Sequence, residues 1–148
     1  MLNKNASILN DLIATTIDSA EGYREAAEDT TDARFATLFR DRAQERRDAV
    51  AHLRAEVRRL GEEPEDDGTI LAAAHRTFMG LKELVTGNDD RAIITEVERG
   101  EGHIKEKYED ALKNDDLDPA CRSVVQNCYT SVQQGHAQMS ALKDRVTD

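Results

Sequence analysis

Apolar residues recur every three to four positions along most of this chain, which is the spacing of helices that bury one face. The pattern predicts five helices, at about residues 2–29, 32–60, 69–86, 89–113 and 118–146. Thr31 or Asp32 is expected to cap the second helix, Gly61 to end it, and Asp118 to cap the last helix, whose first turn begins at Pro119. No repeat, low-complexity tract or linker interrupts the pattern, so we expect a single domain over residues 1–148.

The lengths of these helices predict the topology. Four of them have roughly 24 to 30 residues, whereas the helix at 69–86 has about 18 and spans roughly 27 Å. A short helix there can run back along the bundle, so the long helices before and after it would be parallel neighbours. Two antiparallel hairpins joined by one long crossover form the ferritin-like arrangement. We therefore predict an all-α, ferritin-like four-helix bundle with an additional short crossover helix between the second and third bundle helices. A plain up-down bundle of five helices is the alternative.

Composition and charge argue against certain classes of binding partner and favour one cellular compartment. Hydrophobic residues make up 39%, charged residues 34% and aromatic residues 4%, a mix that suits long amphipathic helices rather than sheets. The net charge of −10 argues against nucleic acid and anionic membranes as partners, and no apolar run approaches the roughly 20 residues of a membrane span. The N-terminus lacks the pattern of a signal peptide. Cys121 and Cys128 lie about 10.5 Å apart along one predicted helix, too far for a disulfide, which favours a reducing cytoplasm.

Two charged residues interrupt apolar stripes. Glu101 falls between Val97 and Ile104, and Arg46 falls within the stripe of the second predicted helix. A carboxylate that faces a helical core must be paired, protonated or bound to a metal. We expect the Arg46 guanidinium to bind Glu101 in a bidentate manner. The predicted buried polar network consists of Glu21, Arg46, Glu98, Glu101 and His136.

Several segments resemble a bacterial family of ferritin-like proteins of unknown function. The similarity covers nearly the whole chain, at Asp18–Glu28, Gln44–Arg46, Gly61–Pro64, His75–Arg76, Glu98–Glu101 and His136. The resemblance implies a four-helix bundle with a crossover segment, a cytoplasmic location, an association with stress responses, and pairing into dimers. It assigns no reaction.

Two alternatives to the buried ion pair stay open: Glu101 could reach the rim of the bundle and pair with Lys105 four residues on, or it could belong to a metal site. Iron-handling ferritin-like proteins supply one Glu from each of two helices and a Glu-x-x-His from each of the other two, a ligand set that suits iron or manganese. Where this chain should read Glu-x-x-His it has Glu45-x-x-Asp48 and Gln133-x-x-His136, and Glu45 and Asp48 project away from the apolar stripe. The alternative di-iron or di-manganese site would use Glu21, Glu98, Glu101 and His136. A fixed Arg46 charge among these ligands would repel a dication.

Three classes of function stay open. The first, which we favour, is a non-enzymatic, homo-oligomeric bundle, a dimer through one helical face. The second is a di-metal carboxylate protein that oxidises or stores iron or handles peroxide. The third is a partner-binding module that uses a face of the crossover helix around Phe78, Leu81 and Val85, for a partner the sequence does not identify. No serine, cysteine or glycine-rich motif has the spacing for nucleophilic or phosphate chemistry.

Glycines occur inside two of the predicted helices. Gly100, Gly102 and Gly135 each cost about 1 kcal/mol relative to alanine in such positions. We expect close approach between helices to offset that cost, with Gly100 or Gly102 facing another subunit.

Overall fold

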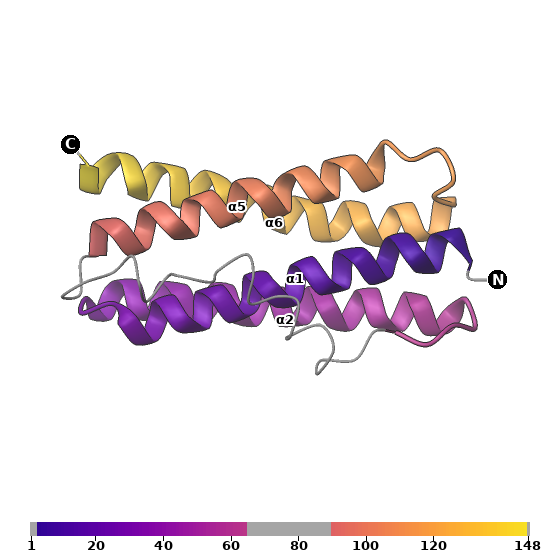
Figure 1. Cartoon of the computed structure of the whole chain (residues 1–148), viewed down its shortest axis with the longest axis horizontal. Coiled ribbons are helices and arrows are strands. Elements are labelled where there is room, and N and C mark those ends of the chain that lie inside the picture. Colours follow the sequence, from indigo (N-terminus) through magenta and orange to yellow (C-terminus); the bar gives the residue numbers. More distant parts are fainter. Residues whose placement is uncertain (1–2, 65–89, 148) are drawn as a thin grey trace.

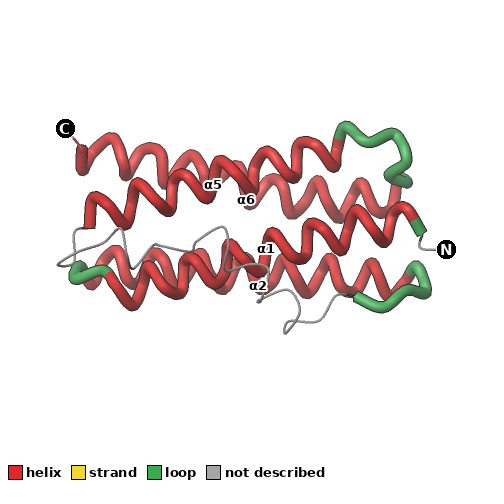
Figure 2. Tube along the Cα trace, viewed as in Figure 1, coloured by secondary structure: helices red, strands yellow, loops and turns green. Residues whose placement is uncertain are grey.

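The computed structural model describes residues 3–64 and 90–147, and these residues form four helices (Figure 2). The helices are α1 (Lys4–Asp29), α2 (Ala33–Arg59), α5 (Asp90–Leu112) and α6 (Pro119–Thr147). The described ranges contain no strand, so the predicted all-α class is confirmed. The helix expected at 69–86, with Phe78, Leu81 and Val85, lies outside the described residues. No helix in the described ranges is both long and apolar enough to cross a membrane.

The helix ends follow local sequence signals. Asn3 caps α1 by accepting from the Asn5 amide at 2.8 Å, and Asp32 caps α2 in the same way through the Arg34 amide. Asp118 accepts from the amide of Cys121 at 2.8 Å at the start of α6. Gly61 has φ of +81°, a conformation that costs a glycine little, and it ends α2 as predicted. The three capping side chains accept hydrogen bonds from backbone N–H groups that have no partner within the helix, and the glycine lets the chain turn away at the end of α2.

The four helices form two antiparallel hairpins, α1 with α2 and α5 with α6 (Figure 1). Helices α2 and α5 run in the same direction, as the predicted crossover topology requires. They are not neighbours, however, because α1 packs on α5 and α2 packs on α6, which places α2 and α5 on a diagonal of the bundle. The expectation that they would lie side by side was therefore wrong. The arrangement is that of a ferritin-like four-helix bundle.

The buried apolar residues fall into two clusters along the bundle. The larger cluster includes Leu9, Ile13, Leu53, Ile104 and Val125. The smaller cluster lies toward the other end of the bundle and includes Tyr23, Phe39, Ile93, Val97 and Met139. Charged side chains from α2 and α5 are buried between these clusters, and they form the site described next.

Candidate functional site

Arg46 and Glu101 form an ion pair in the centre of the bundle. Nη2 of Arg46, on α2, donates to Oε2 of Glu101, on α5, at 2.7 Å, and each side chain is only 1% exposed. The pair therefore bridges the diagonal of the bundle. The contact is a single hydrogen bond rather than the expected bidentate one, because Nε and Nη1 of Arg46 lack hydrogen-bond partners in the described structure.

The ring of Tyr23, on α1, faces the same guanidinium. The ring centroid lies 5.7 Å from Cζ of Arg46, within the range of a cation–π contact. Burial raises the pKa of Tyr23 well above its ordinary value, and the negative charge of Glu101 raises it further. Tyr23 therefore stays a neutral phenol at physiological pH, and it supplies a π face to a cation that is removed from water.

The fourth helix contributes the space that the ion pair occupies. A Cβ atom added to Gly135, on α6, would lie 2.5 Å from Nη2 of Arg46 and 2.8 Å from Oε2 of Glu101. No alanine side chain could fit there unless the pair moved. We expected Gly135 to allow a close approach between helices. Its missing side chain instead leaves room for the two bonded atoms, Nη2 of Arg46 and Oε2 of Glu101. Gly102 has no atom within 4 Å of its added Cβ.

A second arginine, Arg42, lies beside the pair, and the sequence analysis did not single it out. Its residue is 9% exposed, its Cδ would lie 3.4 Å from a Cβ at Gly135, and Nη2 donates to the side-chain oxygen of Gln138 on α6. Nη1 of Arg42 also lies 2.5 Å from Oε2 of Glu45, which is half-exposed. Arg42 stands one helical turn before Arg46 and therefore lies on the same face of α2. Its place on this apolar face is the sequence feature that could have identified it as buried.

The other predicted members of the polar network lie elsewhere. Glu98 accepts from the Ser140 hydroxyl at 3.3 Å, and His136 lies 3.8 Å from the same carboxylate; both side chains are partly exposed. Glu21 accepts from Nε of Arg24 at 2.9 Å on its own helix. Among the described residues, no hydrogen bond or ion pair joins Glu21, Glu98 or His136 to the Arg46–Glu101 pair. A step of three residues turns a helix by about 300°, which leaves Glu98 at the margin of the stripe that contains Glu101.

The residues proposed for the di-metal alternative do not form a ligand set in this arrangement. Oε2 of Glu101 binds Arg46, the Glu21 carboxylate binds Arg24, and Glu98 and His136 lie near the surface. In the described ranges, one group of three potential ligands has mutual spacing suited to a metal, and it consists of Glu56, Asp118 and Cys121. None of the four predicted ligands belongs to it. We derive no chemistry through a metal at the centre of this bundle.

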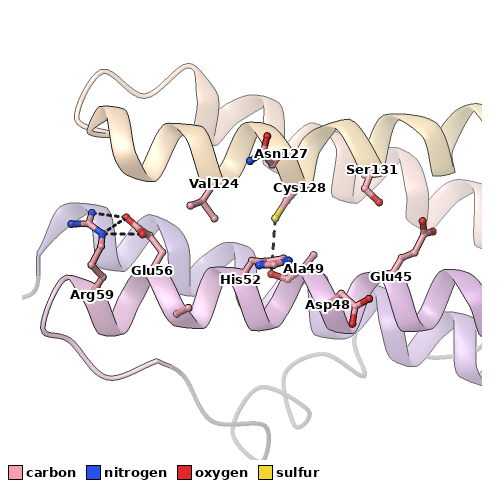
Figure 3. Close-up of a pocket in the computed structure, with 11 residues that line it drawn as sticks. Glu45, Asp48, Ala49, His52, Glu56, Arg59, Val124, Asn127, Cys128 and Ser131 are labelled. Carbon is pink, nitrogen blue, oxygen red and sulfur yellow. Dashed lines mark hydrogen bonds and ion pairs between the residues drawn. The ribbon is translucent and has the colours of Figure 1, made fainter.

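The Glu56–Asp118–Cys121 group has a structural role that its contacts explain. Arg59 donates to both oxygens of the Glu56 carboxylate, with its Nε at 2.9 Å from each, and these bonds hold the pKa of Glu56 below its ordinary value (Figure 3). The thiol of Cys121 lies 3.4 Å from Glu56, and burial with the nearby carboxylates raises its pKa to about 12. The thiol is therefore neutral at physiological pH and a poor nucleophile. The group ties the end of α2 to the start of α6.

Comparison with known proteins agrees with this fold. The model of a protein family described as "Domain of unknown function (DUF2383)" matches residues 4–114. Among solved structures, a mutant of Dps1 from Mycobacterium smegmatis is similar, with a TM-score of 0.76 and 13% sequence identity. The match covers 97% of this chain and 99% of that one. At that identity the likeness establishes the fold alone. No curated protein matches the sequence.

Proposed function

This chain belongs to the DUF2383 family, a domain of unknown function, and we propose that it is a non-catalytic, ferritin-like protein whose central polar layer is structural. In this proposal the Arg46–Glu101 ion pair occupies the place that a metal site would take in an iron-handling bundle. The observation that carries it is the 2.7 Å contact between two side chains that are each 1% exposed. The association with stress responses stays an implication of the family resemblance.

Charge is the physical reason why this layer would not hold a dication. Arg46 and Arg42 both bring a permanent positive charge to the layer, and Glu101 is the carboxylate bonded to Arg46 there. A divalent ion would have to displace the guanidinium from Glu101 and then lie beside two cations in a medium of low dielectric. Replacing the pair by a metal would also leave Arg46 buried without its partner, which is strongly unfavourable.

We further propose that the protein is cytoplasmic and forms homodimers. Two free, buried cysteines, Cys121 and Cys128, suit a reducing compartment. Self-association is what the resemblance to ferritin-like proteins implies.

Metal content is the experiment that tests the structural role of the polar layer. The chain is purified without chelator, reconstituted anaerobically with ferrous iron or with Mn²⁺, desalted, and measured by elemental analysis. We expect no stoichiometric metal in the wild-type protein, because the Arg46 guanidinium opposes it. The Glu101→Gln variant, whose side chain is nearly isosteric with the natural one, is measured in parallel.

The proposal is contradicted if the wild type retains about two equivalents of metal per chain and Glu101→Gln loses them. Two equivalents is the number that a ferritin-like di-metal site would hold. Glu106→Gln, at an exposed position on α5, is the control for an acidic surface that binds metal without a defined site. Metal lost equally in both variants would indicate surface binding and leave the proposal standing. Circular dichroism establishes that each variant is folded.

A further inference from the structure

A groove of about 620 Å³ runs between α2 and α6. Its apolar floor includes Ala49, Val124 and Cys128, and the Cys128 side chain points from α6 toward α2 (Figure 3). Helix α2 packs far more extensively on α1 than on α6, so the groove lies along the looser side of the bundle. An apolar groove of this size on a helical bundle is a candidate contact surface.

Four charged residues of α2 line this groove, and the exposed ones have opposite signs at its two ends. Asp48 adds a second exposed carboxylate near Glu45, while Glu56, which pairs with Arg59, is only 9% exposed. Glu45 lies at one end and Arg59 at the other, with His52 between them (Figure 3). Both end residues stand seven positions from His52, which is close to two helical turns, so all three share one face of α2 over about 21 Å. The side chains of Glu45 and Arg59 are 46% and 51% exposed. Each can therefore accept a further partner without leaving its contact within the chain.

We propose that this groove is the interface between two copies of the chain, related by a two-fold axis that passes next to His52. A two-fold interface must be complementary to itself. With the two α2 helices antiparallel, Glu45 of each copy faces Arg59 of the other, and His52 faces its own equivalent. The small side chains of Ala49 and Ala55 let the helices approach closely. The inference rests on the proposed self-association and specifies its surface.

The groove on the opposite side of the bundle does not have this charge pattern. It lies between α1 and α5, and its charged residues are Asp11, Lys107 and Asp110. There Lys107 stands three residues from Asp110 on the same helix, and both residues are exposed. In the first groove, by contrast, Glu56 stands three residues from Arg59 but has a side chain only 9% exposed. The exposed charges of opposite sign are thus not separated toward opposite ends of this second groove. Two copies related by a two-fold axis at this second groove would not bring opposite charges together at both ends. Lys107 therefore supplies a control position on a surface we do not assign to the interface.

Charge reversal tests the proposed pairing. The dimer dissociation constant of the full chain is measured by sedimentation equilibrium for the wild type, Glu45→Arg, Arg59→Glu and the double variant. Each single reversal places like charges opposite each other at two symmetry-related contacts, and we expect at least about tenfold weaker association. The double reversal restores opposite charges and returns the constant to within about threefold of wild type. Lys107→Glu, the matched control, leaves it unchanged.

Crosslinking at the axis gives a second readout that does not depend on the charged pairs. A residue beside a two-fold axis meets its own equivalent, so His52→Cys should form a disulfide-linked dimer under mild oxidation. Ala137→Cys, exposed on α6 and outside the groove lining, should not.

The possible failures are distinguishable. A dimer that neither reversal weakens and that His52→Cys does not crosslink overturns this interface but leaves self-association intact. Weakening by both single reversals without recovery in the double variant overturns the pairing of Glu45 with Arg59. A chain that stays monomeric at all concentrations overturns both the interface and self-association. The groove would then be a candidate site for a small molecule, because its volume is typical of ligand pockets. None of these results depends on the metal content of the core.

Discussion

Two arginine–glutamate pairs in this bundle use the same chemistry in opposite surroundings. Arg46 and Glu101 join two helices across the core, and each is 1% exposed. Arg59 and Glu56 lie three residues apart on α2, where the arginine is 51% exposed and the carboxylate 9%. One pair is removed from water on both sides, whereas the other keeps its cation in solvent.

The difference shows how much surrounding structure a buried pair requires. Helical spacing alone brings Arg59 to Glu56, because residues three apart lie on one face. The Arg46–Glu101 pair depends on all four helices, since Tyr23 supplies a π face and Gly135 leaves the space for the bonded atoms. Removing two charges from water costs several kcal/mol per ion, and the attraction within the pair largely offsets that cost rather than adding net stability.

The largest expected effect is the loss of the buried cation. Arg46→Met leaves the Glu101 carboxylate buried without its partner, and we expect the free energy of unfolding to fall by about 3–5 kcal/mol. Arg59→Met, the matched variant in the other pair, should cost far less because solvent screens that pair. Urea unfolding at neutral pH measures both. Equal losses in the two variants would show that burial does not distinguish the pairs.

A smaller effect is expected when the space beside the buried pair is filled. An alanine at Gly135 would bring Cβ to 2.5 Å from Nη2 of Arg46, so Gly135→Ala should destabilise the fold by about 1–3 kcal/mol. Gly102→Ala on α5 meets no atom within 4 Å and should instead stabilise the fold by up to about 1 kcal/mol, through helix propensity alone. Thermal unfolding of both variants gives the comparison. Stabilisation by both alanines would mean that Arg46 moves aside without cost.

The smallest effect concerns the pH dependence of the half-exposed pair. Arg59 lowers the pKa of Glu56 below its ordinary value of 4.5, so the folded state favours the ionised carboxylate. The resulting stabilisation is complete above about pH 4.5 and is lost as the pH falls through the lowered pKa. Unfolding of wild type and Glu56→Gln between pH 3 and 7 should therefore show a stability difference that narrows at the acid end. A difference that is constant with pH would contradict this.

The sequence predicted the four helices that the structure describes, the caps at Asp32 and Asp118, the end of α2 at Gly61, and the two central charged residues. Arg46 and Glu101 could be recognised because each replaces an apolar residue in a regular stripe, and a charge in that position needs a partner. The parallel direction of α2 and α5 was predicted from the order and lengths of the helices. The diagonal placement of α2 and α5 was not, because helix lengths carry no information on which helices are neighbours around the bundle.

The remaining polar contacts depend on how the helices meet. Glu98 lies only three residues from Glu101, yet that step turns its side chain toward Ser140 and His136 at the surface. Arg42 and Glu56 also lie in apolar stripes and could have been found by testing every charged residue for its place in the helical period. The contact between Glu56 and Cys121 could not have been predicted from the helical period, because 65 residues separate them and only the packing of α2 on α6 brings them together.

A double-mutant cycle on Arg46 and Glu101 tests the central claim most directly. Arg46→Met and Glu101→Leu are measured singly and together by urea unfolding of the full chain. We predict that each single variant loses about 3–5 kcal/mol, while the double variant, which buries no charge at this contact, lies within about 1 kcal/mol of wild type or is more stable. Losses that simply add in the double variant would contradict the claim that the two side chains act as one buried pair.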